Sequence, residues 1–411
     1  NMNIVTEGNF LLKNGDKVYF TSCTSKASFI ENQGYEIVKT YKPFNLNDPK
    51  DQSVNYLATH KEEMIDWLGA EIEAAKQVKA DVVITSPGFF GPQVAFATEI
   101  PVVALMNGQY LPKSKGLMGI SLATDSTKHK ILRKLLNPVF KKSFVKNYLS
   151  EILDAYRKLG ITQEIKSREE LYAPMHILIP GDDEFEPQLE LDGRTKYVGP
   201  IFWNGFEKMK TDLTEKKLEE FKGNSKLVLI NFGGSVFELE TYRRILNFIK
   251  DLDAKVIVAL GPNFPREKFQ KDNDSLIIRT YIPGLRVSKY ADVIVNTGSQ
   301  GAIMQALENG KPVVSFPVGI DQAYFANRLE EMGLGINVNK TSILKFSKRE
   351  SYQIKDDTVP AKILEAVSEI LKNPVYTKNA YEYSLRLKAK NYKPRKTVVQ
   401  FIYDLVEKKW Y

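Results

Sequence analysis

The chain has 411 residues, 43% of them hydrophobic and 26% charged, and this length indicates two domains rather than one compact core. Its single cysteine, Cys23, excludes a disulfide within the chain, and no apolar run is long enough to predict a membrane-spanning helix, so we expect a cytoplasmic protein. The formal net charge of +8 comes from basic residues spread along the chain, which favours a role in solubility over nucleic-acid binding.

Short buried strands alternate with helices through the first half of the chain. The predicted strands are Lys17–Thr21, Asp81–Ser86, Val102–Asn107 and His176–Pro180. Apolar residues recur at helical spacing in Glu62–Lys76, and Asn3–Lys13 also has a helical pattern. Strand and helix in alternation predict a parallel sheet with right-handed crossovers.

A long basic region, residues 128–160, interrupts this alternation. Its apolar residues recur at helical spacing among many lysines, which predicts amphipathic helices. One hypothesis is that residues 128–146 make a peripheral contact with an anionic membrane, which would favour a lipid acceptor. The alternative is a pair of helices that face solvent.

The second half repeats the alternation. Its predicted strands are Lys226–Phe232, Lys255–Gly261, Leu276–Thr280, Val293–Thr297 and Pro312–Phe316, and Glu238–Asp251 predicts a helix. Gly199 and Pro200 break regular structure between the two series. We therefore predict an α/β protein with one doubly wound domain at 1–203 and another at 204–385. We also predict a C-terminal helix at 386–411, for which one option is that it crosses back to the first domain.

The most informative segment runs from Ala291 to Val338. A buried strand is followed by the small-residue turn Thr297-Gly298-Ser299-Gln300-Gly301 and a helix over Ala302–Glu308. In doubly wound domains, ligands bind where such turns follow the carboxyl ends of strands. The first turn of a helix offers free backbone N–H groups and the positive end of the helix dipole, which suit a diphosphate. The alternative is a glycine turn that only allows close packing.

The order of motifs in this segment resembles the donor-binding signature of the UDP-glycosyltransferase superfamily, which includes bacterial macrolide glycosyltransferases. The matching residues are Thr297-Gly298-Ser299-Gln300-Gly301-Ala302, Gln305-Ala306-Leu307, Gly310-Lys311-Pro312, Pro317, Asp321-Gln322 and Ala326-Asn327. The resemblance implies the GT-B fold, in which two Rossmann-like domains face a cleft.

The resemblance also implies roles for individual residues. Asp321 and Gln322 correspond to the pair that binds hydroxyls of the transferred sugar, although Asp321 could instead cap a helix over Ala323–Met332. The diphosphate would contact Thr297, Gly298, Ser299, Gln300, Gly301, Ala302 and Ser235, and the base and ribose would contact Tyr281, Ile282 and Gln305.

Five departures from the family pattern stand out. Thr297 replaces a phosphate-contacting histidine, Gln305 a ribose-binding glutamate and Gly284 a glutamine. The acidic partner of the catalytic histidine corresponds to Thr85 or Ser86. The catalytic histidine itself would fall just before Asn1, and the first strand with its glycine loop is also absent. Either the chain is a fragment of a longer protein or it naturally lacks its base, because His60, His129 and His176 do not match that position.

The function implied by the resemblance is an inverting transfer of a hexose from a nucleotide diphosphate sugar to a hydroxyl group. A UDP-sugar is the expected co-substrate, with no cofactor and no metal, and the acceptor would be a small hydrophobic molecule or a lipid. Candidate acceptor residues are Phe89, Phe90, Asn107 and Tyr110, which follow predicted strands. Two alternatives remain: an inactive GT-B protein that binds a nucleotide sugar or a protein partner, and a sugar-nucleotide epimerase.

Overall fold

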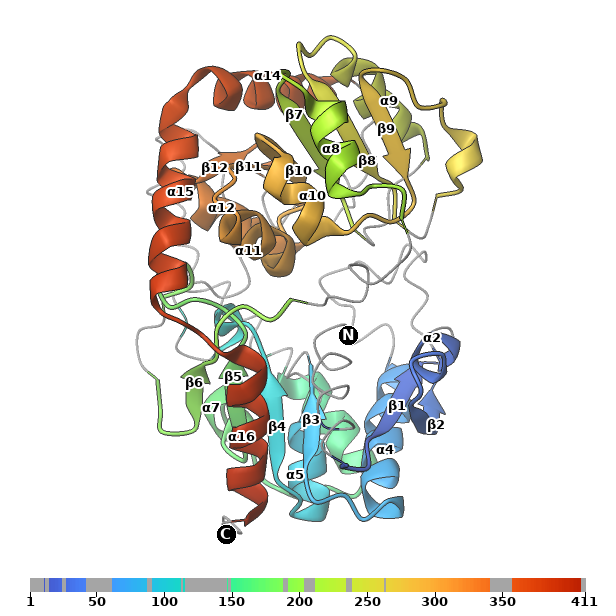
Figure 1. Cartoon of the computed structure of the whole chain (residues 1–411). Coiled ribbons are helices and arrows are strands. Elements are labelled where there is room, and N and C mark those ends of the chain that lie inside the picture. Colours follow the sequence, from blue (N-terminus) through green and yellow to red (C-terminus); the bar gives the residue numbers. More distant parts are fainter. Residues whose placement is uncertain are drawn as a thin grey trace. The chain divides into compact units, whose positions relative to one another are not determined.

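The computed structural model forms two compact units, each built around parallel β-sheet (Figure 1). The first unit comes from residues up to 117, from 134–201 and from 392 onward, and the second mainly from 202–391. The structure describes residues 11, 15–23, 27–41, 61–86, 91–111, 114, 146, 149–187, 191–202, 211–233, 239–261, 264–340 and 357–407. The predicted domain boundary at 203/204 lies outside these ranges, as do the predicted helix Asn3–Lys13, except for Leu11, and most of the basic region 128–146.

The second unit contains a six-stranded sheet in which every neighbouring pair of strands is parallel. Its strands are β7 (Leu227–Asn231), β8 (Lys255–Ala259), β9 (Leu276–Arg279), β10 (Val293–Asn296), β11 (Val313–Ser315) and β12 (Gly335–Asn337). Val, Ile and Leu follow one another in most of these strands without polar alternation, as expected where helices cover both faces. The order β12-β11-β10-β7-β8-β9 reverses between β7 and β10.

Helices surround this sheet. They are α8 (Glu215–Lys222), α9 (Leu239–Ile249), α10 (Gly284–Tyr290), α11 (Gln300–Glu308), α12 (Ile320–Glu331), α14 (Thr358–Lys372) and α15 (Pro374–Ala389), with a 3-10 turn at Arg266–Lys268. Ile245 of α9 and Ile363 and Val367 of α14 are buried with strand residues in one core, so these helices share a face of the sheet. On the other side α10 contacts α8 and α11, and α11 contacts α15.

The described strands of the first unit form two separate parallel sheets, although the sequence predicted one doubly wound domain. One sheet has the order β3-β4-β5-β6, and the other pairs β1 with β2. The strands are β1 (Tyr19–Cys23), β2 (Glu36–Tyr41), β3 (Val83–Thr85), β4 (Val102–Leu105), β5 (Met175–Ile179) and β6 (Thr195–Tyr197). The helices are α2 (Ala27–Glu31), α4 (Lys61–Gln77), α5 (Pro92–Thr98) and α7 (Arg168–Tyr172), with a 3-10 turn, η3, at Gly108–Tyr110.

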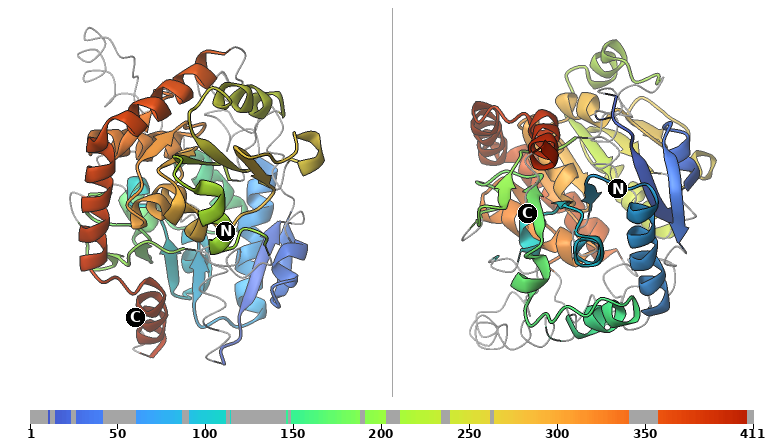
Figure 2. Two further views of the ribbon diagram at one scale, coloured as in Figure 1. Left: turned by 45° about the horizontal axis from the view of Figure 1, so that its top comes forward. Right: turned by 90° about the horizontal axis from the view of Figure 1, so that it is seen from below.

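The last helix, α16 (Pro394–Glu407), belongs to the first unit and lies along its larger sheet (Figures 1 and 2). Val398 and Ile402 are buried in one core with Val103 and Leu178. A Cβ atom on Gly199 would lie 2.4 Å from the Tyr392 side chain, so the chain entering α16 packs directly on the residues after β6. The predicted final segment starts at residue 386, which lies within α15.

The predicted parallel α/β architecture is confirmed, and each predicted strand overlaps an observed one. Three strands were not predicted. Residues in β2 include three charged or polar side chains among six, and β6 and β12 have three residues each. No helix in the described ranges is long and apolar enough to cross a membrane.

Candidate functional site

Two loops meet at the point where the strand order of the second unit reverses. Asn296, the last residue of β10, is paired in register with Asn231, the last residue of β7. The loop after β10 begins at Thr297, and the loop after β7 begins at Phe232. Doubly wound sheets bind ligands at the carboxyl ends of the strands that flank such a reversal. The predicted diphosphate loop therefore starts at the position where this topology provides a site.

Asn296 fixes the conformation of the loop after β10 through its side-chain hydrogen bonds. It was not predicted as a site residue. Its side chain is fully buried, and its Oδ1 accepts hydrogen bonds from the Gly298 amide at 2.8 Å and from the Ser315 hydroxyl at 3.1 Å. Its Nδ2 is buried without a hydrogen-bond partner in the part of the chain that the structure describes. A polar residue that ends a strand of three apolar ones was the available signal in the sequence.

Gly298 joins the predicted diphosphate loop to the predicted sugar-binding pair. Its φ of +81° lies in the left-handed region that favours glycine. A Cβ atom there would lie 2.9 Å from the Gln322 carbonyl oxygen and 3.4 Å from Ala326 Cβ. The loop therefore packs against the first turns of α12, which brings the two predicted halves of the donor site into contact.

The start of α11 leaves backbone amides available for an anion. Ser299 is the N-cap residue, but its side chain makes no capping hydrogen bond. The first helical hydrogen bond runs from the Ile303 amide to the Ser299 carbonyl at 3.0 Å. The amides of Gly301 and Ala302 therefore precede the regular hydrogen-bond ladder of the helix. Backbone amides at a helix start, together with the helix dipole, are suited to binding an anion.

Asp321 and Gln322 differ in what their side chains already do. The Gln322 Oε1 accepts hydrogen bonds from the Val318 amide at 2.9 Å and from the Gly319 amide at 3.1 Å, so it holds the loop before α12. Only its Nε2 remains to donate to a ligand. The alternative that Asp321 caps a helix over Ala323–Met332 does not hold, because α12 begins at Ile320 and Gly319 is its N-cap residue.

The electrostatic state of Asp321 is set mainly by burial. Burial raises the pKa of the Asp321 carboxyl above its ordinary value, and hydrogen bonds from the Gln322 and Asp321 backbone amides partly oppose this effect. A Cβ atom on Gly319 would lie 2.9 Å from Asp321 Oδ1, so a side chain at position 319 would crowd the carboxylate. Hydrogen bonds from donors such as sugar hydroxyls would stabilise the carboxylate, because burial has removed water from it.

The two roles of Gln322 can be separated by substitution. Gln322→Glu keeps an acceptor for both loop amides and removes the Nε2 donor, so it is expected to unfold within a few degrees of the wild type while binding the donor sugar more weakly. Gln322→Ala removes both roles and is expected to cost about 1–2 kcal/mol of unfolding free energy. Thermal unfolding and calorimetric titration with a nucleotide sugar measure the two effects. A Gln322→Glu protein with unchanged sugar affinity would rule out a ligand contact by Nε2.

Gly284 and Gln305, two departures from the family pattern, lie next to each other in the structure. Tyr281 and Ile282 follow β9, with Tyr281 exposed and Ile282 buried. A Cβ atom on Gly284 would lie 2.8 Å from Gln305 Oε1. Glycine at 284 therefore leaves the room that the Gln305 amide occupies, and a longer side chain at 284 would displace Gln305.

The predicted acceptor-side residues lie in the first unit. Thr85 is buried at the end of β3 and Ser86 follows it, while Asn107 and Tyr110 follow β4 and are half-buried. Phe89, Phe90 and Ser235 lie outside the described residues.

Gln109, which was not predicted, lies between Asn107 and Tyr110 and is fully buried. The backbone amide of Gln109 donates to Glu186 Oε1 at 2.9 Å. Neither polar atom of the Gln109 side chain has a partner in the described ranges. A buried amide in this state is costly unless water or a ligand completes its hydrogen bonds.

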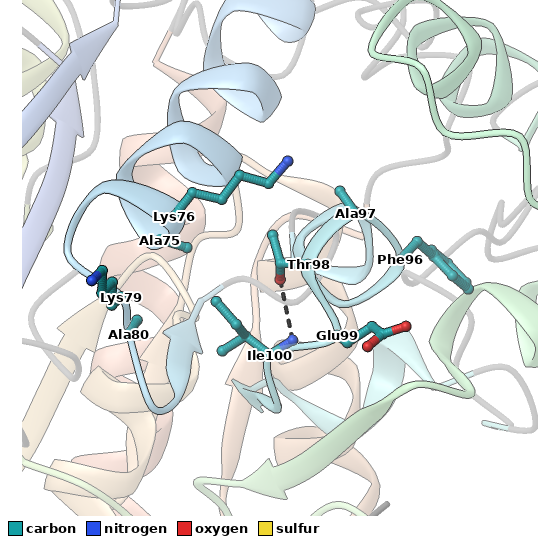
Figure 3. Close-up of a pocket in the computed structure, with 9 residues that line it drawn as sticks. All are labelled: Ala75, Lys76, Lys79, Ala80, Phe96, Ala97, Thr98, Glu99 and Ile100. Carbon is teal, nitrogen blue, oxygen red and sulfur yellow. Dashed lines mark hydrogen bonds between the residues drawn. The ribbon is translucent and has the colours of Figure 1, made fainter.

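A shallow pocket of about 550 Å³ lies elsewhere in the first unit (Figure 3). Ala75, Lys76, Lys79 and Ala80 line one side of it, and residues 96–100 line the other. These residues end α4 and α5 and precede β3 and β4, so the pocket lies at the amino ends of the strands. The chemistry of doubly wound domains occurs at the opposite edge, and we do not assign this pocket to the site.

Comparisons with known proteins agree with this arrangement. Residues 243–402 match the family model for the C-terminal domain of erythromycin biosynthesis protein CIII-like proteins. The chain is 22% identical to the uncharacterized UDP-glucosyltransferase YojK of Bacillus subtilis strain 168 over 69% of this chain and 67% of YojK. It is 29% identical to the NDP-glycosyltransferase YjiC of the same organism over 39% of this chain and 40% of YjiC.

A solved structure shares the fold over nearly the whole length. The glycosyltransferase VinC, solved in complex with dTDP, superposes with a TM-score of 0.64 at 16% identity, over 99% of this chain and 96% of VinC. Parallel sheets, the run of motifs from Thr297 to Asn327 and these likenesses lead to one assignment. The chain has the GT-B fold, and its sequence resembles those of the UDP-glycosyltransferases named above.

Proposed function

We propose that this protein is an inverting glycosyltransferase that moves a hexose from a nucleotide diphosphate sugar to a hydroxyl group of a small hydrophobic or lipid acceptor. The contact between Gly298 and the Gln322 carbonyl is the observation that carries the proposal. It joins an uncapped helix start, suited to a diphosphate, to a half-buried carboxylate, suited to sugar hydroxyls.

A UDP-sugar is the proposed donor. The base would lie against the backbone of Tyr281 and Ile282, and Gln305 would accept a hydrogen bond from the ribose. Gln305 is neutral, so this bond would be weaker than one to a carboxylate. Because the VinC structure holds dTDP, thymidine nucleotides belong in the same test.

The proposed reaction is one displacement at the anomeric carbon. The acceptor oxygen forms a bond to that carbon as the bond to the diphosphate oxygen breaks, and the acceptor proton passes to a general base. The amides at the start of α11 would stabilise the negative charge that develops on the departing diphosphate. General base catalysis contributes about 10²–10⁴-fold to such reactions.

A panel of UDP- and dTDP-sugars, incubated with and without hydroxylated acceptors, tests the proposal. Acceptor-dependent release of the nucleotide, with a glycoside of inverted anomeric configuration, is the expected result. Saturable binding with no turnover would instead support the inactive GT-B protein. A new sugar nucleotide formed without an acceptor would support the epimerase.

Gln109 provides a test of the acceptor side. Gln109→Leu removes a buried amide whose polar atoms lack partners, so the free protein is expected to keep or gain about 1 kcal/mol of stability. If Gln109 binds a polar group of the acceptor, the acceptor KM is expected to rise about tenfold with donor affinity unchanged. Steady-state kinetics and thermal unfolding measure both. A marked loss of stability would show that buried water satisfies the amide and that its role is structural.

A further inference from the structure

A chain of three hydrogen bonds links α4 to the start of α5 in the first unit. The Trp67 indole donates to Glu71 Oε1 at 2.7 Å, and the Gln93 side-chain amide donates to Glu71 Oε2 at 2.6 Å. Gln93 Oε1 in turn accepts from the Gly91 backbone amide at 2.7 Å. Gln93 is fully buried, so each of its partners is fixed by packing.

Gly91, the last residue in this series of hydrogen bonds, lies against the sheet at the end of β3. A Cβ atom at Gly91 would lie 2.6 Å from Thr85 Cγ2 and 3.2 Å from Met175 Sδ. Thr85 is one of the two residues, with Ser86, that the resemblance matches to the acidic partner of the catalytic base. The hydrogen bonds of Glu71 and Gln93 therefore determine how closely the backbone at Gly91 is held to a residue of the proposed acceptor side.

Glu71 is the acceptor at the centre of this series of hydrogen bonds, and it has no basic partner among the described residues. In the described part of the chain its hydrogen-bond donors are the neutral Trp67 and Gln93, and burial raises the pKa of the Glu71 carboxyl to about 7.

The charged and titratable groups around Glu71 leave it as the group that changes charge near pH 7. From the helical stretch 149–158, Tyr156 faces it, and burial raises the pKa of that phenol well above its ordinary value, so Tyr156 stays neutral. The charges that α4 shares with its neighbours are paired elsewhere: Glu73 with Lys39 of β2 at 2.9 Å, and Lys61 with Asp154 at 2.7 Å.

Protonation of Glu71 weakens this series of hydrogen bonds, because a neutral carboxyl is a weaker acceptor than a carboxylate. A proton on Oε1 faces the Trp67 indole donor, and the first hydrogen bond is lost. A proton on Oε2 that points at Gln93 meets an amide donor, and that hydrogen bond is lost. If the Gln93 amide turns over to accept the proton, its nitrogen then faces the Gly91 amide, and the last hydrogen bond is lost instead. Each of these changes loosens the link between Gly91 and α4.

We propose that Glu71 and Gln93 are positioning residues of the transferase, which in the ionised form of Glu71 hold Gly91 against Thr85 and so order the acceptor side of the site. This inference rests on the proposed function. Its consequence is a loss of acceptor affinity as the pH falls, while the donor site in the second unit is unaffected.

The test compares the full chain with Glu71→Gln, Trp67→Phe and the control Glu73→Gln, which removes an exposed carboxylate from the same helix. For the wild type, the acceptor KM is expected to rise about tenfold per pH unit below pH 7 with little change in kcat. Glu71→Gln should show a high and pH-independent acceptor KM, and Glu73→Gln should match the wild type. Trp67→Phe should move the transition to higher pH, because the lost hydrogen bond stabilised the carboxylate.

A second readout needs no substrate. The Trp67 indole N–H resonance, assigned by its absence in Trp67→Phe, should shift with a midpoint near pH 7 in the wild type and not in Glu71→Gln. Exchange of the Gly91 amide with solvent should become faster below that midpoint. A resonance that does not titrate between pH 5 and 9 would overturn the inference.

The two readouts separate this inference from the proposed function. Titration of Trp67 with an unchanged acceptor KM would overturn the positioning role and leave the transferase intact. Absence of turnover with every acceptor would overturn the proposed function, and in that case the hydrogen-bond chain would be judged by the Trp67 and Gly91 measurements alone.

Discussion

Gly298→Ala is expected to abolish measurable nucleotide binding and to lower the unfolding free energy of the second unit by about 2–4 kcal/mol. An L-residue at a φ of +81° is strained by about 1–2 kcal/mol. The added methyl group would also lie 2.9 Å from the Gln322 carbonyl oxygen, which belongs to the backbone of α12 and cannot turn away like a side-chain tip. The loop and the helix must then separate, which disconnects the two halves of the proposed donor site.

Gly301→Ala is the matched control for the stability effect. Gly301 lies three residues later in the same segment, has no positive φ, and a Cβ atom there would meet no atom within 4 Å. Alanine is favoured over glycine in a helix by up to about 1 kcal/mol, so this variant is expected to be as stable as the wild type or slightly more so. Thermal unfolding and calorimetric titration with UDP measure both variants. Wild-type UDP affinity in Gly298→Ala would contradict a donor site at this loop.

The sequence predicted the second unit better than the first, and the reason lies in the strands. β7, β10 and β11 are apolar runs bounded by polar or small residues, which is the pattern of strands buried on both faces. β2, in contrast, contains Glu36 and Lys39, and none of its side chains is fully buried. Its pairing with β1 depends on contacts that no local pattern records.

The structure of the loop after β10 could be predicted because its pattern is local. Thr297 to Ala302 form a strand-turn-helix segment whose residue types and spacing are visible in the sequence. The interactions that complete the site were not predictable, because each joins residues distant along the chain. The Gly298 contact with Gln322, the Gly284 contact with Gln305 and the Glu71 hydrogen bond to Gln93 each span more than twenty residues.

Gln322 shows that a motif resemblance does not determine what each polar atom of a side chain binds. The resemblance implied that Gln322, with Asp321, binds hydroxyls of the transferred sugar. In the structure its oxygen is committed to the Val318 and Gly319 amides, which leaves Asp321 as the stronger candidate for sugar recognition. The consequence is that the largest loss of sugar specificity should follow substitution of Asp321.

Asp321→Asn is expected to lower kcat/KM for the donor sugar about 30- to 150-fold, which corresponds to about 2–3 kcal/mol for hydrogen bonds to a charged acceptor. The same variant should lose no stability at pH 7. Because burial raises the pKa of Asp321, the ionised form is less favourable in the folded than in the unfolded state. The contribution of Asp321 to stability is therefore greatest at acid pH and declines as the pH rises through the folded-state pKa. At neutral pH, asparagine replaces a buried charge by a neutral group that still has a carbonyl oxygen for the backbone amides.

The test is decisive because Asp321→Asn is expected to lower kcat/KM for the donor without lowering stability at pH 7. Glu331→Gln, at the far end of α12 and exposed, is the control and should change neither quantity. If Asp321 were only a structural residue of the first turn of α12, Asp321→Asn would lower the melting temperature and leave kcat/KM within a few-fold of the wild type. Donor kinetics and unfolding measured on the same protein samples distinguish these outcomes, because a carboxylate kept for binding costs stability at neutral pH, whereas one kept for the fold supplies it.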